Sequence, residues 1–179
     1  MHRKTIDYSV ELFPPSTPAG RENLRVTVSA LAALNPRFFS VTFGAAGAAT
    51  QQLTTSLVSE LVAADIETAP HMTCLHLTPS DVDHLLQTYR AQGIRRLVVI
   101  RGDEAENAEK KQHYFSHAVE LVRYIREKTG DWFALFVAAY PEFHPECMNC
   151  ETEFQYLAAK AKAGATAAIT QYFFSQEAY

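Results

Sequence analysis

The stretch TPSDVDHLLQTYRAQGIRRLVVIRGD, residues 78–103, contains a helix with both ends marked, followed by a buried strand. Thr78 can cap the helix, with Asp81 three residues later, and Pro79 suits the first turn. Gly93 suits the position just past the last turn. The apolar positions repeat with the helical period: Val82, Leu85, Leu86 and Tyr89. The run RLVVI has the composition of a strand buried on both faces, so this stretch predicts one helix–strand pair of a parallel α/β fold.

The same unit recurs along the chain at a period of about 30 residues. Apolar runs that predict strands begin near Tyr8, Arg37, Glu67, Arg96, Trp132 and Thr166. Helical patterns lie between the runs, and their expected buried faces are Leu24, Val28 and Leu31; Leu53, Leu57, Val58 and Leu61; Ala118, Leu121, Val122 and Ile125; and Phe154, Leu157 and Ala161. Gly130 and Gly164 end the last two helices. The sequence therefore predicts five βα units and a sixth strand.

Two architectures use such units, the doubly wound sheet and the (β/α)8 barrel. A doubly wound nucleotide-binding sheet needs a glycine-rich phosphate turn after an early strand. Here Pro14 and Pro15 follow the first strand, and GAAGAAT, residues 44–50, lacks the dinucleotide glycine spacing. We therefore favour an α/β fold of the TIM-barrel type.

The length of 179 residues is short for that barrel. Eight units need about 240 residues. We expect one partial TIM-barrel catalytic domain over residues 1–179, with about six βα units and without the last two strands. An open barrel of this kind exposes two strand edges, and we expect it to be unstable or to aggregate unless something completes it.

Composition limits the classes of function. The chain has 16 Lys+Arg against 20 Asp+Glu, a net charge of −4 and 47% hydrophobic residues. These values indicate a globular domain without the basic field that attracts nucleic acid or anionic membranes. No apolar run approaches the ~20 residues of a membrane span, and the N-terminus lacks the apolar centre of a signal peptide. The three cysteines do not indicate a disulfide framework, so we expect a cytoplasmic protein.

Polar or small residues follow or interrupt every predicted strand, and in a βα barrel the chemistry sits at the carboxyl ends of the strands. They are Glu11; Thr42 and Ala45; His71; Arg101, Gly102 and Asp103; Tyr140 and His144; and Gln171. Glu11 stands within an apolar strand, where a charged carboxylate is costly. It is either paired with an arginine such as Arg101 or is a general acid with a raised pKa. The pattern predicts one pocket with several convergent polar groups.

The residues that follow the fifth predicted strand raise the alternative of a zinc site. His144, Cys147 and Cys150 have the spacing HxxCxxC. A structural zinc site usually needs a fourth ligand, and no second CxxC is present, so we predict no metal site.

Seven motifs resemble the methylenetetrahydrofolate reductase family in order and spacing, from about Ser9 to Phe174: SVELFPP, FFSVTFGA, APHMTC, VVIRGD, AAYPEFHPE, KAGA and AITQYFF. The resemblance implies an oxidoreductase on a (β/α)8 barrel, active in one-carbon metabolism and methionine supply. Such a flavoprotein binds FAD, accepts hydride from NADH or NADPH in a ping-pong cycle, and reduces 5,10-methylenetetrahydrofolate to 5-methyltetrahydrofolate. Family members are commonly homo-oligomers.

The resemblance also implies roles for particular residues. Glu11 matches the general acid, Asp103 an aspartate near flavin and folate, and Gln171 a glutamine that contacts folate or nicotinamide. The positions that match FAD contacts are Thr42, Ala45, His71, Arg101, Gly102, Asp103, Tyr140, His144, Glu153 and Lys160. The chain departs from the family pattern at Phe43, where tyrosine is common, and at Tyr156 and Ala159, where polar or basic residues are frequent.

Two other functions stay open at this point. The chain could be a truncated, catalytically weak or inactive homologue that acts as a flavin-binding or interaction module. It could also be a metal-dependent barrel hydrolase that uses His71, His144 and a carboxylate.

Overall fold

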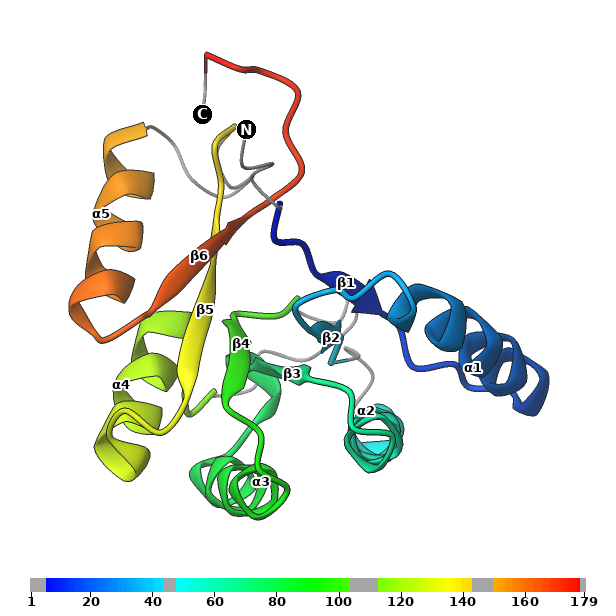
Figure 1. The fold of residues 1–179 in the computed structure, drawn as a ribbon. Helices are drawn as coiled ribbons and strands as arrows, with labels where there is room; N and C mark the ends of the chain where they lie inside the picture. The colour runs from blue at the N-terminus through cyan, green and yellow to red at the C-terminus, as the bar shows by residue number, and fades with distance from the viewer. Residues whose placement is uncertain (1–5, 44–47, 104–112, 143–149, 178–179) are drawn as a thin grey trace. The chain divides into compact units, whose positions relative to one another are not determined.

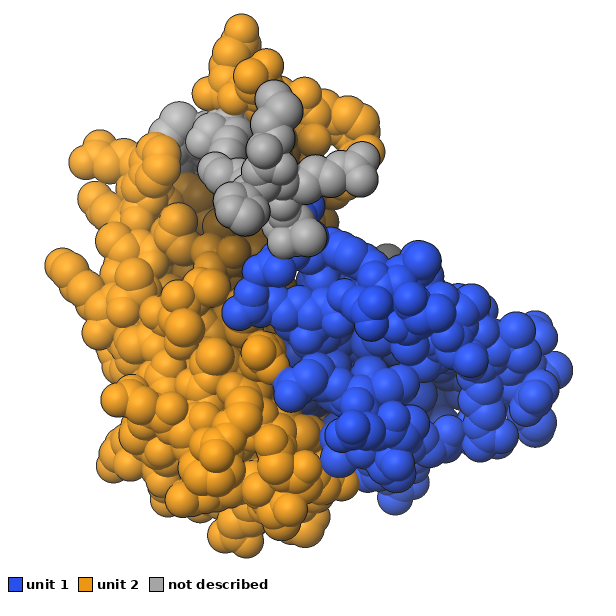
Figure 2. Space-filling view, in the orientation of Figure 1, with its two compact units in different colours: residues 1–71 blue, residues 72–179 orange. Residues whose placement is uncertain are grey.

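The structure is a computed structural model that describes residues 6–43, 48–103, 113–142 and 150–177. The described residues form six strands and five α-helices that alternate along the chain (Figure 1). The chain divides into two compact units, Met1–His71 and Met72–Tyr179 (Figure 2). The boundary falls within strand β3 (Thr68–Thr73).

The first unit contains β1 (Val10–Leu12), α1 (Pro18–Ala32), β2 (Phe39–Val41), α2 (Ala48–Ala63) and the first part of β3. Strand β2 pairs in parallel with both β1 and β3, and Ser40 lies opposite Glu11 on one side and Ala69 on the other. All three residues of β2 are buried. Val58 and Leu61 of α2 are buried as well, so the predicted apolar face of this helix supplies part of the core of the unit.

The second unit contains a 3-10 turn (Cys74–His76), α3 (Pro79–Ala91), β4 (Arg96–Ile100), α4 (Ala118–Thr129), β5 (Ala134–Ala139), α5 (Cys150–Lys162) and β6 (Ala167–Thr170). Strand β5 pairs in parallel with β4 and β6, and Phe136 lies opposite Val98 and Ala167. Along β5, alternate residues are buried, as a strand of period two requires: Leu135, Val137 and Ala139.

Helix α3 forms as its sequence predicts. The Thr78 hydroxyl accepts from the Asp81 amide at 3.2 Å, and the Asp81 carboxylate accepts from the Thr78 amide at 2.9 Å, which completes a capping box. The four predicted core positions of this helix are all buried. Gly93, just past the end, has φ +77°, a conformation that favours glycine.

Helix α5 corrects one prediction. Phe154, expected on its apolar face, is 70% exposed, whereas Glu153 and Lys160 are each only 8% exposed. These two residues are seven apart and therefore lie on one face, two turns from each other. The buried face of α5 thus carries a charged pair, and a search for apolar periodicity does not identify such a face.

The fold class is confirmed. In both units the strands are parallel, and neighbours in sequence are neighbours in the sheet. This order is that of consecutive βα units of a (β/α)8 barrel, whereas a doubly wound sheet reverses its strand order at a switch point.

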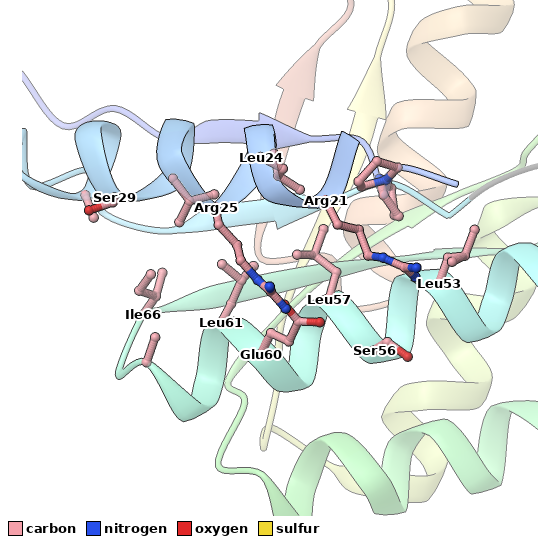
Figure 3. Close-up of a pocket in the computed structure, with 15 residues that line it drawn as sticks. Arg21, Leu24, Arg25, Ser29, Leu53, Ser56, Leu57, Glu60, Leu61 and Ile66 are labelled. Carbon is pink, nitrogen blue, oxygen red and sulfur yellow. The ribbon is translucent and has the colours of Figure 1, made fainter. Parts of the chain in front are cut away.

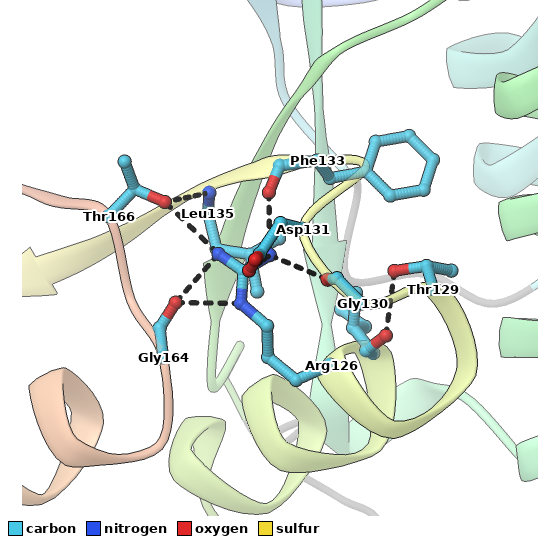
Figure 4. A network of polar contacts seen from close by, with 9 residues as sticks. Arg126, Thr129, Gly130, Asp131, Phe133, Leu135, Gly164 and Thr166 are labelled. Atoms are coloured by element: carbon cyan, nitrogen blue, oxygen red, sulfur yellow. Dashed lines mark hydrogen bonds and ion pairs between the residues drawn. The ribbon is translucent and has the colours of Figure 1, made fainter.

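Arg126 of α4 connects the loops that precede β5 and β6 (Figure 4). Its Nε and Nη2 atoms donate to the Gly164 carbonyl at 2.8 and 2.7 Å, and Nη1 donates to the carbonyls of Gly130 and Phe133 at 2.9 and 2.8 Å. Nη2 also donates to the Thr166 hydroxyl at 3.1 Å. One half-buried guanidinium therefore satisfies carbonyls from two loops that precede neighbouring strands.

Candidate active site

Glu11 and His71 come together in the first unit. Glu11 is the central residue of β1, and its Oε2 atom lies 3.5 Å from Nε2 of His71 on β3. The Glu11 side chain is 53% exposed and that of His71 only 7%. The expectation of a buried carboxylate is therefore wrong: on this three-residue strand Leu12 points into the core and Glu11 faces solvent. Its partner within the first unit is a histidine rather than an arginine.

Burial sets the charge state of His71. It lowers the pKa of the imidazole to about 4, so the ring is neutral at pH 7. The distance of 3.5 Å to Glu11 is long for a hydrogen bond, and among the described residues Nε2 has no hydrogen-bond partner. A buried polar atom without a partner calls for an explanation, and a ligand is one.

Thr73 shows the same feature on the same strand. Its Oγ1 atom is buried and has no hydrogen-bond partner in the described part of the chain. His71 and Thr73 are two residues apart, so both project from one face of β3. We did not single out Thr73 from the sequence. The signal was present in APHMTC, where the alternation places two polar side chains on one face of a strand that is buried throughout.

Thr42 lies just past β2, and both its backbone amide and its carbonyl form hydrogen bonds. Its amide donates to the Leu12 carbonyl at 2.9 Å, and its carbonyl accepts from the Thr54 hydroxyl at 2.9 Å. The Thr42 side chain is half-buried. Ala45, predicted beside it, lies outside the described residues.

A pocket of about 150 Å³ lies at the carboxyl ends of β4 and β5 in the second unit. It brings together four of the residues expected to bind the cofactor: Arg101, Tyr140, Glu153 and Lys160. Gly102, next to Arg101, has φ +83°, so the permissive backbone expected at this strand end is used. Asp103 is exposed. His144 lies outside the described residues.

The charges in this pocket influence one another. Burial lowers the pKa of Lys160, and Glu153 opposes the effect. The Lys160 ammonium donates to the Ala138 carbonyl at 2.5 Å, which ties α5 to β5. Burial raises the pKa of the Tyr140 phenol, the Glu153 and Asp103 carboxylates add to the shift, and Arg101 opposes it. Glu153, Asp103 and Arg101 thus lie close enough to act on one phenol.

Two aromatic rings from different helices complete the pocket wall. His117 precedes α4 as its N-cap residue, and its ring stacks on Tyr156 of α5 with centroids 6.2 Å apart and an interplanar angle of 23°. We did not predict His117 as a site residue, although its place after β4 and directly before a helix was a usable signal. Tyr156, which departs from the family pattern, offers a flat surface in place of a polar group.

A larger cavity, of about 450 Å³, lies between α1 and α2 in the first unit (Figure 3). Leucines such as Leu24, Leu57 and Leu61 form much of its lining, and Arg25 and Glu60 lie 3.3 Å apart across it. None of the predicted site residues lines it. It is a groove between two helices of the first unit.

Metal clusters and membrane-spanning helices were sought among the described residues. In the described ranges, no three His, Cys, Asp or Glu side chains group closely enough to hold a metal ion. His144 and Cys147 of the HxxCxxC motif lie outside those ranges. No helix among the described residues has the length and apolar character needed to cross a bilayer.

The sequence matches the family model for methylenetetrahydrofolate reductase over residues 1–179. The chain belongs to this family. It is 39% identical to the 5,10-methylenetetrahydrofolate reductase of Buchnera aphidicola over 177 residues, which cover 99% of the chain and 59% of that protein. The enzyme of Escherichia coli K12 is 36% identical over 175 residues, which cover 97% of the chain and 57% of that protein. The chain thus spans less than two thirds of the length of these relatives.

Solved structures agree with the fold. A protein from Clostridium thermocellum, described as binding two copies of 5-methyl-5,6,7,8-tetrahydrofolic acid, matches 96% of the chain with a TM-score of 0.62 and 18% identity. A 2,3-dimethylmalate lyase matches 96% of the chain with a TM-score of 0.63 and 12% identity. At these identities the matches show only a shared fold.

Within this methylenetetrahydrofolate reductase family member, most of the predicted residues that the structure describes fall into three groups. Glu11, Thr42 and His71 belong to the first unit, and Arg101, Tyr140, Glu153 and Lys160 share the pocket of the second. Gln171 directly follows β6, where its amide donates to the Ala139 carbonyl at 2.7 Å, and it is not among the residues that line the pocket.

Proposed function

We propose that the chain forms the flavin-binding part of a methylenetetrahydrofolate reductase. It reduces 5,10-methylenetetrahydrofolate to 5-methyltetrahydrofolate, with FAD as the hydride carrier and NADH or NADPH as the donor. The single observation that carries this proposal is the pocket at the ends of β4 and β5, which gathers four residues matched to flavin contacts. Family membership supports it. The proposal places the reaction in cytoplasmic one-carbon metabolism, upstream of methionine.

The residues present fit such a cofactor. Arg101 and the buried Lys160 supply positive charge for phosphate or ring carbonyl oxygens, and Tyr140 and Tyr156 supply flat surfaces. Nε2 of His71 and Oγ1 of Thr73, which have no hydrogen-bond partner among the described residues, provide buried polar atoms that a polar ligand can satisfy. A pocket of about 150 Å³ holds only a part of a dinucleotide. The family resemblance implies further contacts from Thr42, Ala45, Gly102, Asp103 and His144.

FAD, when bound, supplies the hydride chemistry, and the protein supplies binding, orientation and proton transfer. Glu11 is suited to deliver a proton to the folate because its half-exposed carboxylate can exchange protons with water. His71 is neutral at pH 7, so it places no positive charge beside that carboxylate. Asp103 places a negative charge at the end of β4, which suits a cation that develops on the folate, and Gln171 offers an amide to folate or nicotinamide.

The first test is cofactor binding. The protein should take up FAD with the absorbance of a flavoprotein, and Arg101→Ala should weaken FAD binding about tenfold or more through the lost charged contact. Arg123→Ala, an exposed arginine on α4, is the matched control and should bind FAD normally. Protein that cannot be reconstituted with FAD would overturn the proposal.

The second test separates the two half-reactions. Glu11→Gln keeps the size of the side chain and removes its acidity, so reduction of the folate should fall about 100-fold or more, as for the loss of a general acid. Reduction of the flavin by NADH or NADPH should stay within about twofold, because that step needs no proton from Glu11. Stopped-flow absorbance of the flavin measures both. An equal loss in the two half-reactions would give Glu11 a different role.

A further inference from the structure

Glu142, just past β5, holds a segment about 30 residues away in the sequence. Its Oε1 atom accepts from the backbone amides of Phe174 and Ser175, at 2.9 and 2.7 Å. Bonds from amides to a charged acceptor are about twice as strong as those between neutral groups. One carboxylate oxygen therefore fixes two successive peptide groups of the loop that follows β6.

The other end of this segment is also fixed to the end of β5. The Gln171 amide donates to the Ala139 carbonyl at 2.7 Å, which extends the β5–β6 ladder by one bond. Residues 171–175 are thus anchored at both ends to the chain around the end of β5, by Ala139 on one side and by Glu142 on the other. The segment carries Gln171, the residue matched to a folate or nicotinamide contact.

Burial orders this segment only in part, since Phe173 and Ser175 are half-buried. Tyr172 is 78% exposed and Phe174 is 83% exposed, and their rings meet edge to face with centroids 5.0 Å apart. Exposed rings contribute little burial energy, so the backbone bonds to Glu142 have a large share in fixing the conformation. Removing that carboxylate should free the segment without opening the core of the unit.

We propose that Glu142 is a positioning residue for the second substrate. It fixes residues 171–175, and with them Gln171, so that the nicotinamide or folate meets an ordered segment, and it takes no part in holding FAD. This inference rests on the proposed function. Two features separate Glu142 from the cofactor residues: it is not among the residues that line the pocket at β4 and β5, and both of its described bonds go to main-chain amides.

Amide hydrogen exchange tests the positioning directly and does not depend on activity. In Glu142→Ala, exchange at Phe174 and Ser175 should rise about tenfold, because two charge-assisted bonds are lost. In Glu142→Gln, whose amide oxygen can still accept, the rise should be smaller. Glu177→Ala removes an exposed carboxylate from the same region and should leave exchange at both residues unchanged. Unchanged exchange at both amides in Glu142→Ala would overturn the proposal.

Binding measurements test the consequence for substrate. In Glu142→Ala the dissociation constant for FAD should stay within about twofold, whereas KM for NADH or for methylenetetrahydrofolate should rise about five- to twentyfold, with a smaller change in kcat. Glu142→Gln should recover part of the loss. An equal weakening of FAD binding, or a loss confined to kcat, would contradict the role. If the unmodified protein binds no FAD, the proposed function and the substrate role both fail, and exchange alone then shows whether Glu142 orders the segment.

Discussion

At the scale of single residues, His71 predicts how stability depends on pH. Its pKa is about 4 in the folded protein, against 6.5 for an exposed histidine. As the pH falls through the window between these values, the unfolded chain takes up a proton that the folded protein does not bind. Stability should therefore be level above about pH 6.5 and fall toward pH 4, by roughly 3 kcal/mol for this residue.

Urea unfolding at pH 7 and pH 4.5 measures this effect. His71→Gln cannot take up the proton, so its loss of unfolding free energy between the two pH values should be smaller than that of the unmodified protein by about 2–3 kcal/mol. His84→Gln, an exposed histidine of α3, is the matched control and should keep the unmodified pH dependence. If His71→Gln and the unmodified protein lost the same unfolding free energy between the two pH values, burial would not hold His71 neutral.

Single-residue predictions from the sequence succeeded where the cause was local. The cap of α3 needs only Thr78 and Asp81, which are three residues apart, and it forms as expected. The contact between Glu11 and His71 joins residues about 60 positions apart and depends on how β1, β2 and β3 pair. The sequence identified both residues, but neither the exposure of Glu11 nor its histidine partner could be derived from it.

At the scale of elements, the loop between α5 and β6 depends on Gly164. Its φ is +110°, and an added Cβ would lie 2.8 Å from Nε and 2.9 Å from Cγ of Arg126. Gly164→Ala should therefore combine backbone strain with disruption of the Arg126 bonds shown in Figure 4, and lower the unfolding free energy by roughly 2–4 kcal/mol.

Gly93 provides the control for that substitution. It also has a positive φ, +77°, but an added Cβ would meet nothing within 4 Å. Gly93→Ala should cost only the strain of the left-handed conformation, about 1–2 kcal/mol. Equal losses for the two variants in urea unfolding would mean that the contact with Arg126 does not matter.

The elements themselves were predictable because each follows from a local pattern. Six apolar runs became six strands, and the glycines after α4 and α5 end those helices. The orientation of α5 was not predictable in the same way. Its buried Glu153 and Lys160 face a pocket, and a pocket built from β4, β5 and two helices has no signature in the sequence of one helix.

At the scale of the whole molecule, the period of about 30 residues was enough to predict the fold class. Parallel strands that follow chain order need crossover helices, and the sequence shows those helices. The division into two compact units at His71 was not predicted, because it falls inside the continuous strand β3 and nothing in composition marks it. The expected single domain over residues 1–179 stays a prediction.

The residues matched to FAD contacts come from both units, and this distribution gives a prediction for the whole molecule. Thr42 and His71 belong to Met1–His71, whereas Arg101, Tyr140 and Lys160 belong to Met72–Tyr179. If all of them contact one cofactor, FAD should slow amide exchange in both units: after β2 and in β3 of the first, and after β4 and β5 in the second.

Hydrogen exchange with and without FAD is the measurement, and adenosine monophosphate at the same concentration is the control for binding of the nucleotide part alone. We expect FAD to slow exchange about tenfold or more at amides near the ends of β2 and β4 when the cofactor is at about ten times its dissociation constant, because opening then requires its release. Protection confined to the second unit would limit the cofactor site to the pocket of Arg101 and Lys160. In that case Thr42 and His71 would need another role. Nε2 of His71, which has no hydrogen-bond partner within the described ranges, would then bind the folate or Glu11 rather than the flavin.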